Sequence, residues 1–324
     1  MDILIVSNEC DKAHRIGNPI IGRLISALKK ESRVGKVSFS PFSNRVSDLF
    51  RIRSAAKRHD VIHIQFGGLY ALVIFIFLLG INKPKLLTFH GTDIHAKAIL
   101  NTDSYLKKLK IWLNQKASFV LIILMDKLGF VSETLFDYIP QCIYNRNKYK
   151  FFIQELGVDY DLFTPIDKVE ACNRLGIEPR KYVLFSDKSN TILKRRDIAN
   201  SIIQELADGY ELLIMCGVKP HEVPLYINSC DFVLLTSDEE GSPNIVREAL
   251  SCNKRVFSVD VGDVKKQLSG LLNSSIISRN PKDAVSIISQ KISQPYMDNT
   301  RQTLSNRIDF CHIVKSLVDL YYTL

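Results

Sequence analysis

The sequence lacks paired cysteines and long hydrophobic runs. Its seven cysteines, at positions 10, 142, 172, 216, 230, 252 and 311, show no Cys-x-x-Cys spacing and have an odd total. This distribution favours reduced thiols in a cytosolic compartment and argues against a disulfide framework or a zinc site. The longest apolar run, Leu69–Leu79, is far shorter than the roughly 20 residues that span a bilayer, and it predicts a buried core helix. The N-terminus lacks the length and charge of a signal peptide.

Several binding motifs are also missing. No Gly-x-Gly-x-x-Gly follows the first predicted strand, and no Gly-x4-Gly-Lys-Ser/Thr occurs, which argues against an ordinary dehydrogenase and a P-loop enzyme. There is no RNP box, zinc finger or arginine-rich tail, so we expect no nucleic-acid partner.

What the sequence does contain is a basic first half. The 324 residues, 46% hydrophobic and 24% charged, are enough for two globular domains. Residues 1–165 hold 23 Lys and Arg against 14 Asp and Glu, whereas residues 166–324 hold 20 of each, so the first half carries the whole net charge of +9. A basic domain attracts anionic lipids or phosphorylated substrates.

Short apolar runs alternate with segments of helical period along the whole chain. We expect strands at 3–6, 36–39, 61–64, 85–89, 127–131, 150–153, 182–185, 211–216, 232–235, 255–259 and 275–277. Helices are expected between them, at 19–30, 45–58, 68–80, 103–124, 133–139, 194–207, 222–229, 244–252, 262–270, 281–292 and 305–323. Such alternation is typical of parallel sheets with helices on both faces.

This pattern pauses in the turn-rich segment 157–179 and then restarts. We therefore expect an α/β fold with two tandem Rossmann-like, doubly wound domains, residues 1–165 and 166–324, with the last helix free to pack back on the first domain. Because ligands bind at the carboxyl ends of parallel strands, we expect the two domains to face each other across a cleft.

The segment 237–250, which reads S-D-E-E-G-S-P-N-I-V-R-E-A-L, is the most informative stretch. Gly241 and Pro243 predict a turn after a strand, and a helix should begin near Asn244. The free backbone N–H groups at such a helix start attract an anion.

Two carboxylates flank this predicted anion site. Glu240 lies before the turn, and Glu248 lies one turn inside the helix. The arrangement suits a nucleotide sugar, with one carboxylate for sugar hydroxyls, the amides for the diphosphate and the other carboxylate for the ribose. The alternative is an ordinary capped helix with two solvated acids.

The segment 237–250 resembles the E-x7-E signature of the retaining, GT-B fold glycosyltransferases of family 4. Other segments resemble motifs of that family in the expected order, over roughly residues 1 to 324: Asp60–Gly67 (D-V-I-H-I-Q-F-G), Leu87–Asp93 (L-T-F-H-G-T-D), Gly129–Glu133 (G-F-V-S-E), Gly157–Pro165 (G-V-D with Phe163 and Pro165) and Cys252–Gly262. Each piece is weak alone, but the ordered set is specific.

The resemblance implies a set of site residues. Lys194 would contact the donor diphosphate with Arg195 as a second cation, and a phosphate would explain why three cations, 194–196, precede a helix whose dipole they oppose. His90 would lie near the donor sugar and acceptor. The implied catalytic residues are His90, Glu240 and Lys194. The implied donor-binding residues are Gly17, Lys194, Arg195, Gly241, Ser242, Pro243, Asn244, Ile245 and Glu248.

The sequence departs from the family pattern in the first loop (Gly17-Asn18), before the Gly-Val-Asp segment (Leu156) and after the strand at 182–185 (Ser186-Asp187). The third departure puts one phosphate contact in doubt, but His90, Glu240 and Glu248 are kept. Asp159-Tyr160-Asp161 has the spacing of a metal-binding DxD, yet it falls in the interdomain pattern, and we expect no metal and no cofactor.

The function implied is transfer of a sugar, with retention, from a UDP- or GDP-sugar to a hydroxyl of a glycan or lipid-linked acceptor, in cell-surface polysaccharide biosynthesis. The alternatives are a GT-B sugar-nucleotide epimerase and an inactive subunit that binds nucleotide sugars. An anionic membrane is an expected partner, because basic residues accompany apolar ones on two predicted helices: Arg45, Arg51, Arg53, Lys57 and Arg58 on the first, and Lys107, Lys108, Lys110 and Lys116 around Trp112 on the second. We expect a cytoplasmic protein, peripheral on the inner face of the membrane.

Overall fold

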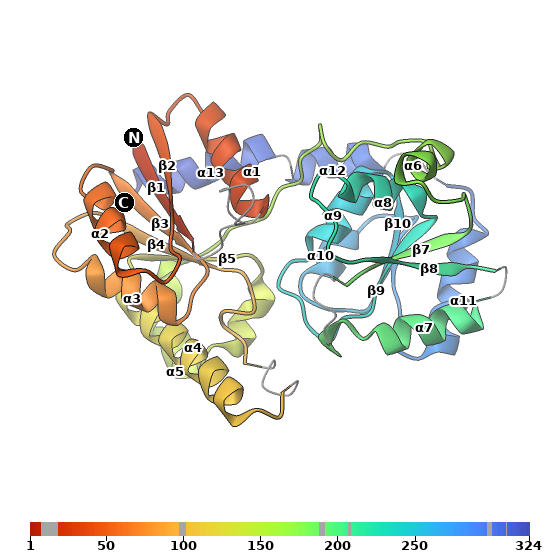
Figure 1. Cartoon of the computed structure of the whole chain (residues 1–324), viewed down its shortest axis with the longest axis horizontal. Helices are drawn as coiled ribbons and strands as arrows, with labels where there is room; N and C mark the ends of the chain where they lie inside the picture. Colours follow the sequence, from red (N-terminus) through yellow and green to blue (C-terminus); the bar gives the residue numbers. More distant parts are fainter. Residues whose placement is uncertain (8–18, 97–101, 188–191, 207–208, 297–299, 309) are drawn as a thin grey trace. The chain divides into compact units, whose positions relative to one another are not determined.

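The computed structural model describes residues 1–7, 19–96, 102–187, 192–206, 209–296, 300–308 and 310–324. The chain divides into two units (Figure 1). Unit 1 comprises Met1–Leu156 together with Phe310–Leu324, and unit 2 comprises Gly157–Asp309. The first crossing between the units therefore lies in the turn-rich segment, a few residues before the expected boundary at 165.

Unit 1 is built on a parallel sheet in the order β2-β1-β3-β4-β5-β6. Its strands are β1 (Asp2–Ser7), β2 (Lys36–Pro41), β3 (Val61–Gln65), β4 (Lys85–Phe89), β5 (Lys127–Phe130) and β6 (Phe151–Ile153). Helices α1 (Pro19–Lys30) and α13 (Phe310–Tyr322) cover one face. Helices α2 (Val46–Ala56), α3 (Leu69–Phe77), α4 (Tyr105–Leu124) and α5 (Gln141–Asn147) cover the other.

The alternation of β1 shows how the sheet acquires two cores. Ile3 and Ile5 point to the α1/α13 face, and Leu4 and Val6 point to the opposite face. All four side chains are fully buried. Because successive strand residues point to opposite faces, a strand that is apolar throughout serves both cores.

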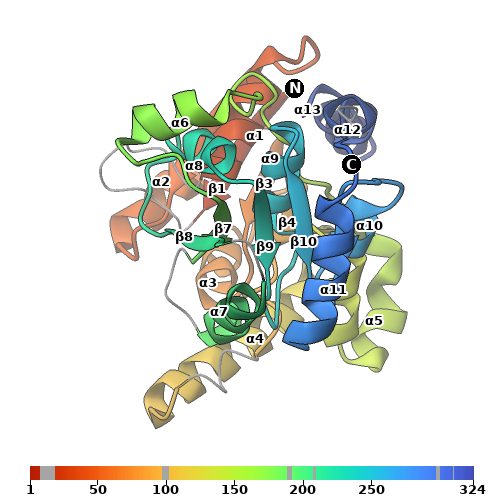
Figure 2. The same ribbon diagram turned by 90° about the vertical axis from the view of Figure 1, so that its right-hand side faces the viewer.

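Unit 2 is built on a second parallel sheet, in the order β11-β10-β9-β7-β8. Its strands are β7 (Tyr182–Ser186), β8 (Glu211–Met215), β9 (Phe232–Leu235), β10 (Arg255–Ser258) and β11 (Ser275–Ile276). Helices α7 (Arg196–Glu205) and α11 (Pro281–Ile292) pack together on one side of the sheet (Figure 2). The other helices are α6 (Lys168–Leu175), α8 (Val223–Ser229), α9 (Asn244–Ser251), α10 (Val264–Leu268) and α12 (Thr300–Ile308).

The strand predictions are confirmed, whereas several helices differ from the prediction. The segment predicted as a helix at 133–139 forms a 3-10 helix, Glu133–Tyr138. Helices α5 and α6 were not expected from the sequence, and the single helix predicted at 305–323 is two helices, α12 in unit 2 and α13 in unit 1. The run 69–79 is not a buried core helix. Ala71, Ile74 and Phe75 are buried, but the opposite side of α3 is exposed.

Helix α13 joins unit 1 through packing and through a buried chain of hydrogen bonds. The Tyr321 hydroxyl donates to His63 Nδ1 (2.6 Å), His63 Nε2 donates to Thr88 Oγ1 (2.7 Å), and Thr88 donates to Gln154 Oε1 (2.6 Å). The Gln154 oxygen can only accept a hydrogen bond, so Thr88 must donate to it and accept from His63, which in turn accepts from Tyr321. Burial lowers the pKa of His63 to about 3, so its ring stays neutral.

The longest helix, α4, has 20 residues. Among the residues that the structure describes, no helix is both long enough and apolar enough to cross a membrane.

We expect α13 to contribute directly to the stability of unit 1. Leu317 is 4% exposed in the core with α1, so Leu317→Ala should cost about 2–5 kcal/mol. Lys315→Ala, on the exposed side of the same helix, should change stability by less than about 0.5 kcal/mol. Urea unfolding followed by circular dichroism and by the fluorescence of Trp112, the single tryptophan, measures both. Equal midpoints for the two variants would contradict the prediction.

Candidate functional site

Both sheets reverse their strand order beside their first strand. In unit 1, β1 lies between β2 and β3, and in unit 2, β7 lies between β8 and β9. At such a switch point the loops that leave the two neighbouring strands run in opposite directions, and ligands of open α/β sheets bind at the carboxyl ends there. The candidate residues of each unit lie at these ends.

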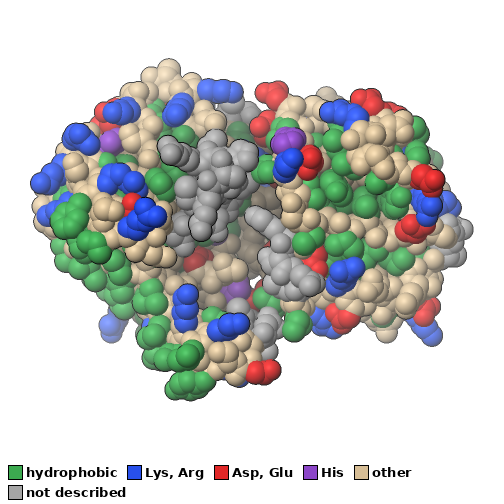
Figure 3. All heavy atoms as spheres, viewed as in Figure 1, with side chains coloured by type: hydrophobic (Ala, Val, Ile, Leu, Met, Phe, Trp, Pro, Cys, Tyr) green, Lys and Arg blue, Asp and Glu red, His purple; other side chains and the backbone are tan. Residues whose placement is uncertain are grey.

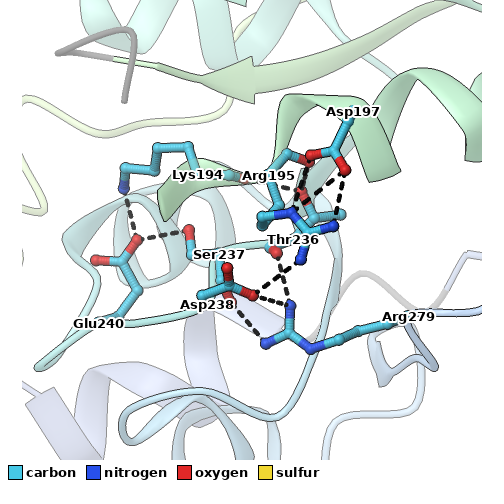
Figure 4. A network of polar contacts seen from close by, with 8 residues as sticks. All are labelled: Lys194, Arg195, Asp197, Thr236, Ser237, Asp238, Glu240 and Arg279. Carbon is cyan, nitrogen blue, oxygen red and sulfur yellow. Dashed lines mark hydrogen bonds and ion pairs between the residues drawn. The ribbon is translucent and has the colours of Figure 1, made fainter. Parts of the chain in front are cut away.

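In unit 2 an ion pair joins the loops that follow β7 and β9 (Figure 4). Lys194, at the end of a short 3-10 helix (Ile192–Lys194), places its Nζ 2.5 Å from Glu240 Oε1. The Ser237 hydroxyl donates to the same carboxylate oxygen at 2.8 Å. The side chains of Lys194 and Glu240 are 23% and 16% exposed, so both remain accessible to a ligand.

Arg279 fixes the loop after β9. Its guanidinium donates to the carbonyl oxygens of Thr236 (3.1 Å) and Ser237 (3.0 Å), and it pairs with Asp238 Oδ1 at 2.8 Å (Figure 4). Arg195 reaches the same Asp238 oxygen at 3.3 Å. One carboxylate thus holds two arginines at the edge of the site, and the 236–238 backbone has little freedom to move.

Arg195 adopts an unusual backbone conformation immediately before α7. Its φ of 52° lies in the left-handed region, which non-glycine residues seldom occupy. The Thr236 hydroxyl lies within hydrogen-bond distance of the carbonyl oxygens of both Lys194 (3.0 Å) and Arg195 (2.9 Å). Asp197 binds the Arg195 guanidinium and raises its pKa further above the usual range. These contacts stabilise a turn that directs Lys194 toward Glu240.

Helix α9 begins at Asn244, as the sequence predicted, and Pro243 at its N-cap makes no side-chain cap. Behind this helix start lies the buried Arg247, 3% exposed, which donates to Ser242 Oγ (2.7 Å) and Asn244 Oδ1 (2.8 Å). Asp263 accepts from Ser242 Oγ at 2.6 Å. These bonds set the path of the chain into the first turn of α9.

The two glutamates of the E-x7-E segment differ in exposure. Glu240 lies in the loop and faces Lys194, whereas Glu248 lies on α9 and its residue is only 9% exposed. Gly241 follows Glu240 directly, and the loop that follows β10 presses against this peptide. A Cβ added at Gly262, whose φ is +56°, would lie 2.6 Å from the Gly241 carbonyl oxygen and 2.9 Å from that of Glu240.

In unit 1, His90 follows β4 and packs beside residues that follow β3. Its ring stacks on Phe66 with centroids 4.1 Å apart, and its Nε2 donates to Gln65 Oε1 at 3.0 Å. Burial lowers the pKa of His90, so the ring is neutral at ordinary pH. Phe66 has a φ of 69°, a strained conformation for an aromatic residue. Gln65 is fully buried, and its Nε2 has no partner among the described residues.

Asp93 holds these loops together. Its buried carboxylate accepts the backbone N–H groups of Gly67 (2.7 Å), His90 (3.1 Å) and Gly91 (2.8 Å), so it ties the end of β3 to the end of β4. Burial raises the pKa of Asp93, and the three amides act in the opposite direction.

The structure thus brings Lys194, Arg195 and the loop with Glu240 together in unit 2. Glu240 is followed in the chain by the segment Gly241–Ile245 and by helix α9, which carries Glu248. His90 lies at the switch-point end of unit 1. Gly17 lies outside the described residues. Asp159 Oδ1 of the DxD accepts the backbone N–H groups of Asp161 and Leu162, both at 3.1 Å, and so shapes a turn. The described part of the chain contains no group of three or more metal-ligating side chains.

Sequence reasoning missed Arg279, Asp238 and Thr236, which support the site. Arg279 lies far along the chain from the residues it holds, and no local spacing indicates the contact. Gln65, Phe66 and Asp93 were inside segments that carried the family resemblance, but only their packing around His90 marks them individually.

No protein-family model matches the chain, and no curated protein matches its sequence. Solved structures do match. Sucrose-phosphate synthase from Thermosynechococcus elongatus aligns with a TM-score of 0.78 and 13% identity over 100% of this chain and 98% of its own. HepE from Anabaena, in complex with UDP-glucose, aligns with a TM-score of 0.75 and 14% identity over 100% of both chains. The catalytic domain of starch synthase IV from Arabidopsis thaliana, bound to ADP and acarbose, gives 0.68 and 12% over 100% and 99%.

These likenesses concern architecture. Two parallel α/β units, with six and five strands, align over the whole chain with glycosyltransferases of the GT-B fold. The predicted GT-B fold class is therefore confirmed.

We expect the contact at Gly262 to be essential for the loop that carries Glu240. Gly262→Ala combines a left-handed φ with a clash against backbone, and it should cost about 2–5 kcal/mol. Gly176→Ala is the matched control: its φ is +69° but nothing lies within 4 Å of the added Cβ, so it should cost only about 1–2 kcal/mol. Urea unfolding measures the free energy of unfolding of both variants. Equal losses would show that the contact between position 262 and the Gly241 and Glu240 carbonyl oxygens does not affect stability.

Proposed function

We propose that this protein is a glycosyltransferase that moves a sugar from a nucleoside diphosphate sugar to a hydroxyl group. The observation that carries the proposal is the accessible Lys194–Glu240 pair at the switch point of unit 2, directly before the start of α9. A cation and helix amides suit a diphosphate, and a carboxylate suits sugar hydroxyls. HepE, whose structure holds UDP-glucose, shares the fold and lends support to this class of donor.

The ion pair gives Lys194 and Glu240 separable roles. In the proposed complex, Lys194 leaves Glu240 and donates to the diphosphate, with Arg195 as a second cation. The freed Glu240 carboxylate accepts hydroxyl groups of the transferred sugar. The turn Gly241–Pro243 and the first amides of α9, at Asn244 and Ile245, approach the diphosphate, and Glu248 binds the ribose. UDP and GDP are the donor nucleotides that we propose.

The reaction breaks the bond between the anomeric carbon and the β-phosphate oxygen and forms a bond between that carbon and the acceptor oxygen. The acceptor proton passes to the departing phosphate, which keeps the charges balanced without a protein nucleophile. Negative charge grows on the leaving diphosphate, so Lys194, Arg195 and the α9 amides stabilise the transition state. The front-face path gives retention at the anomeric carbon, as the family 4 resemblance implies.

Unit 1 supplies the acceptor side in this proposal. A neutral His90 presents a fixed ring, held by Phe66 and by the hydrogen bond to Gln65. The buried Gln65 Nε2 can donate a hydrogen bond to a hydroxyl group of the acceptor, because no described residue accepts one from it. We propose a glycan or lipid-linked acceptor, a role in cell-surface polysaccharide synthesis, and a site at the cytoplasmic face of the membrane.

Incubation with radiolabelled UDP- and GDP-sugars and a membrane extract tests the function. We expect label in a lipid or glycan fraction, and the reaction should proceed in EDTA because the mechanism uses protein cations in place of a metal. Epimerised nucleotide sugar without transfer would indicate the epimerase alternative. Nucleotide binding without any reaction would indicate a binding subunit, and both results would overturn the proposal.

Glu240→Gln should abolish most sugar transfer without weakening nucleoside diphosphate binding. The amide loses the charge that pairs with Lys194 while keeping the shape, so Lys194 is released for the diphosphate and affinity should stay equal or rise. Calorimetry with UDP and GDP, together with the transfer assay, measures both effects. Transfer at the wild-type rate would remove Glu240 from the mechanism.

Lys194→Ala should weaken nucleoside diphosphate binding about ten- to a hundredfold. It removes a charge-assisted hydrogen bond worth about 1.5–3 kcal/mol and leaves the Glu240 carboxylate unpaired beside the phosphates. Lys282→Ala, an exposed lysine on α11 of the same unit, is the control and should bind normally. Unchanged affinity in Lys194→Ala would assign the phosphate contact to another cation.

A further inference from the structure

Exposed apolar side chains gather on three neighbouring helices of unit 1. Of the 21 large hydrophobic residues that are exposed in the described part of the chain, 14 lie on α2, α3 and α4 or directly after α3. They are Val46, Phe50, Leu69, Val73, Ile76, Leu79, Tyr105, Leu106, Leu109, Trp112, Leu113, Val120, Ile123 and Leu124. We name this set the α2–α4 ridge. In Figure 3 hydrophobic side chains extend along the lower left edge, over α3 and α4, with Lys and Arg beside them.

Helix α4 provides the largest part of the ridge. Its first buried residue is Ala117, so the twelve residues 105–116 have no place in the core of unit 1. This half nevertheless contains Leu106, Leu109, Trp112 and Leu113, which are 39–76% exposed. An apolar helix surface of this extent on a monomer marks a contact with another phase or molecule.

Helices α2 and α3 continue the ridge. Leu69, Val73 and Ile76 follow one another at helical spacing on the outer side of α3 and are 37–53% exposed. The Phe50 ring of α2 packs edge-on against Phe77 of α3 with centroids 5.9 Å apart. Asn114 Oδ1 of α4 accepts the backbone N–H of Leu69 at 3.0 Å. The three helices are therefore joined side by side.

All charged residues on α3 and α4 are basic. Helices α3 and α4 contain no Asp or Glu, and α4 carries Lys107, Lys108, Lys110 and Lys116 among its apolar residues. Lys116 Nζ lies 5.5 Å from the Trp112 ring centroid. Lysines mixed with leucines and a tryptophan are the composition of helices that lie in a membrane interface.

We propose that the α2–α4 ridge binds an anionic lipid bilayer, with α4 lying in the headgroup region and its lysines on the lipid phosphates. Charge complementarity favours this occupant over a second copy of the chain. A two-fold contact through the same surface would set the α4 lysines of each copy against one another, with no acid on α3 or α4 to pair them. Lysine is also depleted from protein interfaces.

The proposal defines which surface of the protein meets the membrane, beyond the sugar-transfer chemistry, and its test needs no sugar donor. The full chain is floated with vesicles of phosphatidylcholine alone and with 30% phosphatidylglycerol, at low and high salt. We expect recovery with the anionic vesicles at low salt and little with the neutral ones. The two tests are independent. A negative flotation result would reject membrane binding without bearing on sugar transfer, and a negative transfer assay would reject the proposed function without bearing on membrane binding.

Two sets of variants locate the contact. Replacing Lys107, Lys108 and Lys110 by Gln should lower partition into anionic vesicles about a hundredfold, because each basic residue contributes roughly fivefold. Lys181, Lys265 and Lys282, exposed lysines of unit 2 replaced in the same way, are the control. Leu109→Gln with Trp112→Gln and Leu113→Gln should also reduce binding by at least tenfold. Val169→Gln with Leu272→Gln, exposed in unit 2, should leave binding unchanged.

Three results would overturn the proposal. The first is no recovery with anionic vesicles, and the second is equal recovery with neutral and anionic vesicles at both salt concentrations. The third is binding that the ridge variants keep in full while circular dichroism shows them folded. Sedimentation velocity of the unmodified protein adds one more check, since a dimer that the Leu109, Trp112 and Leu113 substitutions dissociate would assign the ridge to a second copy.

Discussion

Parallel pairing of every described strand is the constraint from which the sites follow. Because all strands in a sheet run the same way, their carboxyl ends meet at one edge, and the loops that leave them are brought together whatever their distance in sequence. The loops still need internal support, and two charged side chains provide it, the buried Asp93 in unit 1 and the partly exposed Arg279 in unit 2. Asp93 binds three amides from two loops of unit 1, and Arg279 binds two carbonyl oxygens and Asp238 in unit 2.

The two cations of the candidate site in unit 2 are paired with carboxylates of the same unit. Lys194 is paired with Glu240, and Arg195 is paired with Asp197 and Asp238, so both cations already have a carboxylate partner. In the proposed complex a diphosphate competes with these carboxylates, which lowers its net gain in binding free energy but favours ligands that also supply hydroxyl groups for the displaced Glu240. We therefore propose that the site discriminates a nucleotide sugar from inorganic phosphate.

Much of this was predictable from the sequence, and the limits have physical reasons. Apolar runs located the strands, and the start of α9 at Asn244 followed from Gly241 and Pro243. The exposed side of α3 was not predictable, because an all-apolar run has no polar side to indicate which way it faces. The contact of Arg279 with the 236–238 loop and the left-handed turn at Arg195 depend on tertiary contacts that leave no local pattern.

The placement of α13 has a consequence for biosynthesis. Unit 2 is one continuous stretch, Gly157–Asp309, but unit 1 takes helix α13 from residues that are translated after the whole of unit 2. Until those residues leave the ribosome, the core that contains Ile3, Ile5 and Leu86 is covered by α1 alone and lacks the side chains of α13, and His63 has no tyrosine to bond. In a nascent chain unit 2 would therefore fold before unit 1 is complete. The apolar surface of the first sheet that α13 later covers would then be the surface that chaperones bind.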